Sequence, residues 1–457
     1  MTNSKQLIHR ARVVNEGRIY MGWVLIDGDS IAECGEGEAP ARLLDNAGIT
    51  VTDARERLLM PGMIDTHVHF REPGMTDRAD ICSESHAAVA GGVTSFIDMP
   101  NTRPATTTLE AFEDKMARAA EVSTANYGFF IGATASNIST LLTADYSRIA
   151  GVKVFMGSST GDMIMSDPAM LERVFAEVPA LIAVHAEDEE LLGQRRRAVT
   201  ERYGEELPIE FHPVIRSHEV CLSASRRAVE LARRLGTRLH LCHVSTADEL
   251  QLLTPGPASG KRITAETCPQ YLIFSDEQYA MLGARIKCNP AIKHACDRDA
   301  LRRALRDGLI DTIATDHAPH LMEQKRGTAL TAASGMPSVQ FALPVLLEMV
   351  NEGIFTLPLI VEKYAHAPAE IFGIEKRGFI RPGYRADLVL ADDDCEPYTI
   401  TDAQAVSRCG WTPYIGLSLN TRVDITWVNG RMAYRHGVLF SSTRGEALRY
   451  NPNSHRR

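Results

Sequence analysis

Short apolar runs alternate with amphipathic segments through the middle of the chain, from residue 58 to about residue 377. The apolar runs are as short as strands that are buried on both faces, and the segments between them repeat apolar residues with helical spacing. The clearest predicted strands are Val93–Met99, Ile149–Met156, Ala180–Val184, Arg238–Cys242 and Ile263–Thr267. Strands that alternate with helices predict a parallel sheet, and a stretch of this length suits a (β/α)8 barrel. An open doubly wound sheet is the alternative, but no Gly-x-Gly-x-x-Gly phosphate loop follows the first strand.

The two ends of the chain have a different pattern, in which short alternating or apolar runs are separated by turns. Asp27-Gly28 and Asn429-Gly430 are residue pairs that tight β-hairpin turns favour. Because both ends predict strands, we expect them to pair into one β module beside the barrel. The predicted domains are therefore a β module of residues 1–57 and 378–457 and a barrel of residues 58–377.

Composition narrows the class of protein. The 457 residues are too many for one ordinary domain, and the hydrophobic and charged fractions, 44% and 23%, are those of a soluble globular protein. A net charge of −9 without a block of basic residues argues against a nucleic-acid partner. Nine scattered cysteines suggest a reducing compartment rather than a disulfide framework. With no signal-peptide pattern and no apolar run that could span a bilayer, we expect a cytoplasmic protein without membrane contact.

The first predicted barrel strand ends in two histidines, His67 and His69, followed by Arg71. Side chains alternate along a strand, so these three point to the same side. Two imidazoles that converge from one strand end can hold a metal such as zinc, and an arginine beside them can bind an anionic group. A pair of buried histidines bonded to the backbone is the alternative at this stage.

Similar polar residues end four more of the predicted strands, and this favours a metal site over a pair of buried histidines bonded to the backbone. The complete set of candidate ligands is His67, His69, Lys153, His185, His243 and Asp316. The carboxyl ends of barrel strands share one face, so the set converges on one site, and core packing alone rarely places such residues at so many strand ends. Lys153 is unusual because an ammonium repels a divalent cation. It either pairs with an acid or reacts with CO₂ to form a carbamate, whose two oxygens could bridge two metals.

The chain resembles the dihydroorotase family, within the cyclic amidohydrolase branch of the amidohydrolase superfamily, over essentially its whole length. The motifs that carry the resemblance are Asp65-Thr66-His67-Val68-His69-Phe70-Arg71-Glu72-Pro73-Gly74, Met99-Pro100-Asn101-Thr102, Lys287-Cys288-Asn289-Pro290 and Ala314-Thr315-Asp316-His317-Ala318-Pro319-His320. The resemblance implies a (β/α)8 TIM barrel with a flanking β-sandwich built from both termini. It also implies two zinc ions, one held by His67, His69 and Asp316 and the other by His185 and His243, bridged by carbamylated Lys153 and a hydroxide.

The activity implied by this resemblance is the reversible cyclisation of N-carbamoyl-L-aspartate to (S)-dihydroorotate in pyrimidine biosynthesis, with Asp316 as the proton shuttle. The implied substrate contacts are Arg71, Asn101 and His320 on the carboxylate, Asn289 on the pyrimidine ring, and Gly335 in a loop whose backbone faces the ring. Simpler roles remain open for three of them: Arg71 could pair with Glu72 or Asp77, and Asn101 and Asn289 could stabilise turns.

Three alternatives stay open. Asp162, soon after Lys153, could supply the bridging carboxylate instead of a carbamate. The substrate could be that of an allantoinase or a dihydropyrimidinase. The chain could also be a non-catalytic partner of a transcarbamoylase, although all six candidate ligands are present. We expect a small-molecule substrate and a homodimer or larger homo-oligomer, with association with a transcarbamoylase possible in addition.

Overall fold

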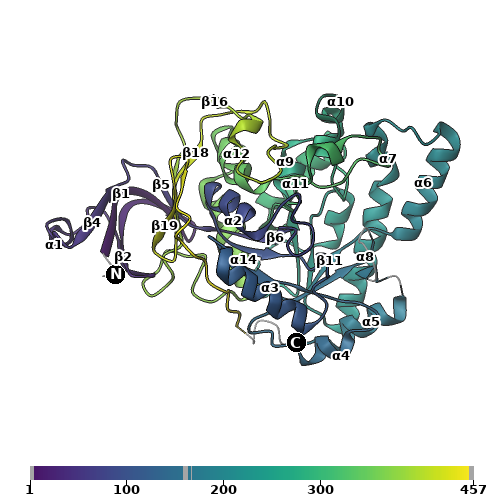
Figure 1. Ribbon diagram of the computed structural model, residues 1–457, viewed down its shortest axis with the longest axis horizontal. Coiled ribbons are helices and arrows are strands. Elements are labelled where there is room, and N and C mark those ends of the chain that lie inside the picture. Colours follow the sequence, from purple (N-terminus) through teal and green to yellow (C-terminus); the bar gives the residue numbers. More distant parts are fainter. Residues whose placement is uncertain (1–4, 158–162, 166, 452–457) are drawn as a thin grey trace.

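The computed structural model describes residues 5–157, 163–165 and 167–451, and its centre is a closed barrel of parallel strands (Figure 1). The barrel strands are β6 (Met63–Val68), β7 (Val93–Asp98), β8 (Asn126–Phe129) continued by β9 (Ile131–Gly132), β10 (Val152–Phe155), β11 (Ile182–His185), β12 (Leu239–Leu241), β13 (Ile263–Thr267) and β14 (Thr312–Ile313). Each strand pairs in parallel with the next. A parallel bridge between Val68 and His317 joins the last strand to the first and closes the ring.

Helices follow the barrel strands and lie outside them. α8 illustrates why they form: buried residues such as Val220, Ala224 and Ala228 recur every fourth position, and the helix ends where Gly236 takes a left-handed conformation. The α-helices of this part are α2 (Ile81–Ala90), α3 (Leu109–Val122), α4 (Ile138–Thr143), α5 (Pro168–Glu177), α6 (Glu189–Tyr203), α7 (His212–Ile215), α8 (His218–Leu235), α9 (Pro269–Ile273), α10 (Tyr279–Leu282), α11 (Ala295–Arg306), α12 (Val339–Asn351), α13 (Leu357–Val361) and α14 (Ala367–Phe372).

Both ends of the chain contribute to one sheet beside the barrel, at the left of Figure 1. Its order is β20-β19-β18-β15-β5-β1-β2-β3, with β4 paired to β1. Apolar side chains from both ends, among them Ile8, Val13, Leu388 and Trp427, pack into a common buried cluster. The strands are β1 (Lys5–Asn15), β2 (Arg18–Asp27), β3 (Ser30–Glu36), β4 (Ile49–Asp53), β5 (Leu58–Pro61), β15 (Leu388–Asp392), β18 (Arg422–Val428), β19 (Arg431–Arg435) and β20 (Val438–Leu439). A short helix, α1 (Ala41–Leu44), and a separate pair, β16 (Tyr398–Thr399) and β17 (Ser418–Leu419), complete the assignment.

The predicted fold, a barrel flanked by a β module from both termini, is confirmed. The apolar spacing over Val339–Ile371 predicts a helical segment, and the structure divides this segment into separate helices. α12 ends at Asn351, Gly353 turns the chain with a φ of 74°, and α13 starts beyond it with Pro358 in its first turn. The domain boundaries at 57/58 and 377/378 stay a prediction. No helix in the described ranges is long and apolar enough to cross a membrane.

Candidate metal centre and substrate pocket

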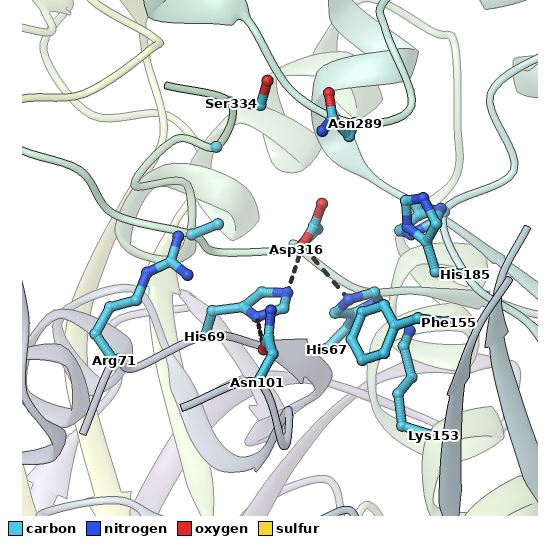
Figure 2. A pocket seen from close by; sticks show the side chains of 13 residues that line it. His67, His69, Arg71, Asn101, Lys153, Phe155, His185, Asn289, Asp316 and Ser334 are labelled. Atoms are coloured by element: carbon cyan, nitrogen blue, oxygen red, sulfur yellow. Dashed lines mark hydrogen bonds and ion pairs between the residues drawn. The ribbon is translucent and has the colours of Figure 1, made fainter. Parts of the chain in front are cut away.

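The carboxyl ends of the barrel strands surround a polar pocket (Figure 2). Ten of the eleven residues proposed from the sequence line this pocket: His67, His69, Arg71, Asn101, Lys153, His185, His243, Asn289, Asp316 and Gly335. The eleventh, His320, lies behind Arg71, with its Nε2 3.1 Å from Arg71 Nη2. Residues that are far apart in the chain therefore meet at one face, where the chemistry of a barrel enzyme is placed.

Three of these residues have a backbone conformation that side chains seldom allow. The φ angles of Arg71, His243 and Asp316 are 68°, 39° and 47°. Left-handed backbone costs free energy in residues other than glycine, and such strain concentrates at functional sites. In each case the residue follows a barrel strand, so the turn of the chain directs the side chain into the pocket.

The first cluster consists of His67, His69 and Asp316. Nε2 of His67 and Nε2 of His69 lie 3.4 Å and 3.1 Å from the same atom, Asp316 Oδ1. All three side chains are buried, and their ligand atoms are close enough to share one metal ion. Two imidazoles and a carboxylate are a donor set that suits zinc.

The hydrogen bonds of His69 show why a cation fits this cluster. Nδ1 of His69 lies 2.8 Å from Asn101 Oδ1, which can only accept, so the imidazole proton is on Nδ1. Burial lowers the pKa of His69 to about 4, so the ring carries no second proton at neutral pH. Its Nε2 therefore turns a lone pair toward the Asp316 carboxylate, and two acceptors at this distance are stabilised by a cation between them. Asn101 was proposed as a carboxylate contact, and the structure places its amide oxygen on His69.

Glu266 is a site residue that the sequence reasoning missed. It is buried on β13 and its carboxylate accepts a hydrogen bond from Nδ1 of His67. It also lies 3.1 Å from Nε2 of His240. Burial alone would lower the pKa of His67, but the Glu266 carboxylate outweighs this and raises that pKa to about 10. The site thus favours a positive charge at His67, which a bound metal would supply in place of the proton. The signal for Glu266 was a charged residue in a short, otherwise uncharged predicted strand.

The second cluster consists of His185 and His243. Nδ1 of His185 lies 2.8 Å from Nε2 of His243, and on its other side Nε2 of His185 donates to Glu187 Oε2 at 2.9 Å. Because the ring proton stays on Nε2, where Glu187 accepts its hydrogen bond, Nδ1 of His185 presents a lone pair to the pocket. Carboxylates that hold histidines in this way are typical of metal sites, where they fix the ring and raise its basicity. Glu187, two residues after His185, was not assigned a role from the sequence.

Lys153 lies between the two clusters and is fully buried. Its Nζ donates to Cys242 Sγ at 3.0 Å, and it forms no ion pair with any acid of the described residues. The alternative that Lys153 pairs with an acid therefore has no support in that part of the chain. Asp162, the rival bridging residue, lies outside the described residues. The carbamylation of Lys153 stays a prediction.

Arg71 forms the wall of the pocket opposite Lys153 (Figure 2). Its Nε donates to the carbonyl oxygen of Pro319 at 3.1 Å. The suggested partner Glu72 instead binds Arg118 at 2.7 Å, and Asp77 lies near Arg78 at 3.6 Å. Burial lowers the pKa of Arg71 to about 10, so it is charged at neutral pH, and among the described residues no acid pairs with it. A buried guanidinium without an acidic partner is costly in free energy, so an anionic ligand in the pocket would stabilise it.

Asn289 lines the pocket from the segment that follows α10, at the top of Figure 2 beside Ser334. Its Oδ1 is buried and has no hydrogen-bond partner among the described residues. A buried carbonyl oxygen without a donor is rare in proteins and costly in free energy. It therefore marks a position where a ligand N–H can bind.

Comparison with known proteins places these features in a family. Residues 58–433 match the amidohydrolase family. The chain is 32% identical to a dihydroorotase from Pediococcus pentosaceus (94% of this chain, 99% of the other) and 34% identical to one from Halobacterium salinarum (89% and 92%). It is also 32% identical to an allantoinase from Streptomyces avermitilis (89% and 91%). A solved structure of an L-hydantoinase (dihydropyrimidinase) from Arthrobacter aurescens superposes with a TM-score of 0.88 at 25% identity, covering 96% of this chain and 98% of that one.

Proposed function

The chain belongs to the amidohydrolase family as a metal-dependent cyclic amidohydrolase, and from this premise we propose that it is a dihydroorotase. One observation carries the choice: the buried, charged Arg71 has no acidic partner among the described residues and faces the pocket beside the metal cluster. Dihydroorotate is a cyclic amide with a carboxylate, which this guanidinium would neutralise. The unpartnered Oδ1 of Asn289 supports the same ligand, because the pyrimidine ring offers an N–H donor.

We further propose that the site holds two zinc ions. His67, His69 and Asp316 would bind one, His185 and His243 the other, and carbamylated Lys153 would join both. When bound, such ions lower the pKa of a water molecule and polarise an amide carbonyl. The donor sets fit this role because Asn101, Glu266 and Glu187 hold the outer nitrogens of three imidazoles and leave the inner ones for metal.

Proton transfer is assigned to Asp316. Burial would raise its pKa, but the positive charge favoured at His67 outweighs this and holds the pKa of Asp316 below its usual value. The carboxylate is therefore ready to accept a proton from the attacking water and to deliver it to the ring nitrogen that leaves. In the biosynthetic direction the proton moves the opposite way, and N-carbamoyl-L-aspartate closes to dihydroorotate with loss of water. Arg71 fixes the carboxylate so that the reacting amide faces the two clusters.

The proposal is tested by measuring kcat/KM on a panel of dihydroorotate, allantoin, dihydrouracil and hydantoin. We expect dihydroorotate to be the best substrate, because among these compounds it has a ring carboxylate for Arg71. The rival substrates come from relatives named allantoinase and dihydropyrimidinase. A higher kcat/KM for allantoin or dihydrouracil would replace the dihydroorotase assignment with the corresponding one. No activity on any member of the panel would reject catalysis on these rings altogether.

Arg71→Met is expected to raise the KM for dihydroorotate about 10- to 100-fold, because it removes charge-assisted hydrogen bonds to the substrate carboxylate. The effect on kcat should be smaller, since Arg71 does not take part in proton transfer. Steady-state kinetics of the purified variant give both values. Arg118→Met is the matched control. Arg118 pairs with Glu72, the residue that follows Arg71 in the chain, and does not line the pocket. An unchanged KM in Arg71→Met would remove the carboxylate contact from the proposal.

A further inference from the structure

Lys325 is a buried lysine that no step of the mechanism uses. It ends the short helical turn Met322–Lys325, in the segment that follows β14. Its Nζ donates to three backbone carbonyl oxygens: Lys287 at 3.0 Å, Ala333 at 2.7 Å and Gly335 at 2.7 Å. An ammonium has three N–H donors, so each is matched to one carbonyl.

These three carbonyls belong to two separate walls of the substrate pocket. Lys287 lies two residues before Asn289, which lines the pocket and whose Oδ1 is buried. Ala333 and Gly335 flank Ser334, and both Ser334 and Gly335 line the pocket on the same side (Figure 2). The backbone N–H of Gly335 also donates to the Lys287 carbonyl at 2.8 Å. Lys325 therefore sits at the junction that sets how the two walls approach each other.

The wall that contains Gly335 packs closely against Ala318. A Cβ at Gly335 would come within 2.6 Å of the Ala318 carbonyl oxygen, and its φ of 127° suits glycine. Ala318 is bonded to the same wall through its N–H, which donates to Met336 O at 2.9 Å. The wall is thus held by close packing on one side and by the Lys325 ammonium on the other.

Lys325 also contacts the part of the site that supports Arg71. Its Nζ lies 5.7 Å from the ring centroid of Trp411, whose Nε1 donates to the carbonyl oxygen of His320 at 2.7 Å. His320 in turn contacts Arg71. The groups that support the proposed carboxylate contact and the ring contact therefore meet around one ammonium.

Keeping the side chain of Lys325 charged in this buried position costs free energy. Burial lowers the pKa of Lys325 to about 7, and repulsion from Lys287 and Arg71 acts in the same direction, while Cys288 and Cys409 oppose it. Among the described residues no carboxylate pairs with Lys325. An apolar side chain would fill such a position at less cost, which indicates that the three directed hydrogen bonds matter for the geometry of the pocket.

We propose that Lys325 is a positioning residue that fixes the spacing between the Asn289 wall and the Ser334–Gly335 wall, and so sets the fit of the substrate ring. The proposal rests on the proposed function only in treating this pocket as the place where a cyclic amide binds. Lys325 does not line the pocket, and its hydrogen bonds go to backbone carbonyls rather than to the proposed metal ligands. Its loss should therefore weaken substrate binding and leave the metal centre intact.

The test compares Lys325→Met with Lys261→Met. Lys261 is the matched control, because its Nζ also bonds a backbone carbonyl, that of Gly308, at 2.7 Å, but it lies away from the pocket and pairs with Asp311. We expect Lys325→Met to raise KM about tenfold for the best substrate of the wild-type protein, with kcat changed less than about threefold and metal content unchanged. Lys261→Met should change neither kinetic constant. A KM within about twofold of wild type, or an equal loss of kcat and kcat/KM, would overturn the proposal.

A second measurement does not depend on the substrate. In ligand-free protein, amide hydrogen exchange in residues 327–336 should be at least about fivefold faster in Lys325→Met than in wild type and in the Lys261 variant. Unchanged exchange in this segment would also reject the proposal. If Lys325→Met does not fold, Lys325→Gln, which keeps a donor amide, is measured in the same way and against the same limits. If dihydroorotate is not the best substrate of the panel, the dihydroorotase assignment is rejected. The hydrogen-exchange result then still tests whether Lys325 holds the two pocket walls.

Discussion

Replacing Lys153 with alanine is expected to reduce the hydrolysis of dihydroorotate about a thousandfold or more, because it removes the group proposed to join the two metal clusters, and metal ions supply several kcal/mol of transition-state stabilisation. Short carboxylates such as acetate or propionate should restore part of the activity, since they would fit the space that the proposed carbamate leaves. The measurement is kcat/KM with and without the added acid, together with the metal content of the purified variant, which should fall below that of wild type.

Lys261→Ala controls for the loss of a partly buried lysine, since Lys261 bonds Gly308 and Asp311 away from the pocket. It should keep wild-type activity and metal. Full activity of Lys153→Ala without any added carboxylate would contradict the bridging role of Lys153. It would then favour Asp162, which lies outside the described residues, as the source of the bridging oxygen.

Asp316→Asn is expected to lower kcat by about two to four orders of magnitude, the range that general acid–base groups contribute. Asparagine keeps the size of the side chain but cannot carry the proton, and its amide is a weaker ligand for the metal that His67 and His69 would share. KM should change less than kcat, because Arg71 and Asn289, not Asp316, are proposed to hold the substrate. Steady-state kinetics at several pH values provide the measurement.

The control for this variant is an aspartate at the other end of β14. Asp311 precedes β14 and pairs with Lys261, whereas Asp316 follows the strand and faces the pocket. Asp311→Asn therefore makes the same chemical change at the opposite end of the barrel and should affect stability more than kcat. If Asp316→Asn kept kcat within about threefold of wild type, another group would have to move the proton.

Residues near one another in the sequence made part of the site predictable. His67, His69 and Arg71 alternate on one strand end, so their common direction follows from strand geometry alone. His185, His243 and Asp316 follow other apolar runs, and the parallel barrel predicted from the same runs brings all strand ends to one face. The structure places them there, around one pocket.

Other parts depended on contacts between distant residues. The contact of Asn101 with the substrate carboxylate stays a prediction, and the structure adds a second contact, in which the amide oxygen of Asn101 meets His69, 32 positions away in the chain. Glu266 and His67 meet inside the barrel, and nothing in the sequence around either residue indicates this contact. Side chains take the rotamer that their three-dimensional neighbours allow, and a chain pattern does not contain those neighbours.

The sequence by itself determined the barrel, the flanking sheet and the identity of the groups that could bind metal, because these follow from hydrophobic periodicity and from which residue ends each strand. Only the tertiary structure decided which imidazole nitrogen faces inward, that Arg71 lacks an acidic partner among the described residues, and that Lys325 joins two pocket walls. The physical reason is that hydrogen bonds and buried charges act over a few ångströms in space. Pairs such as Lys325 and Lys287 are close in the fold but 38 residues apart in the chain.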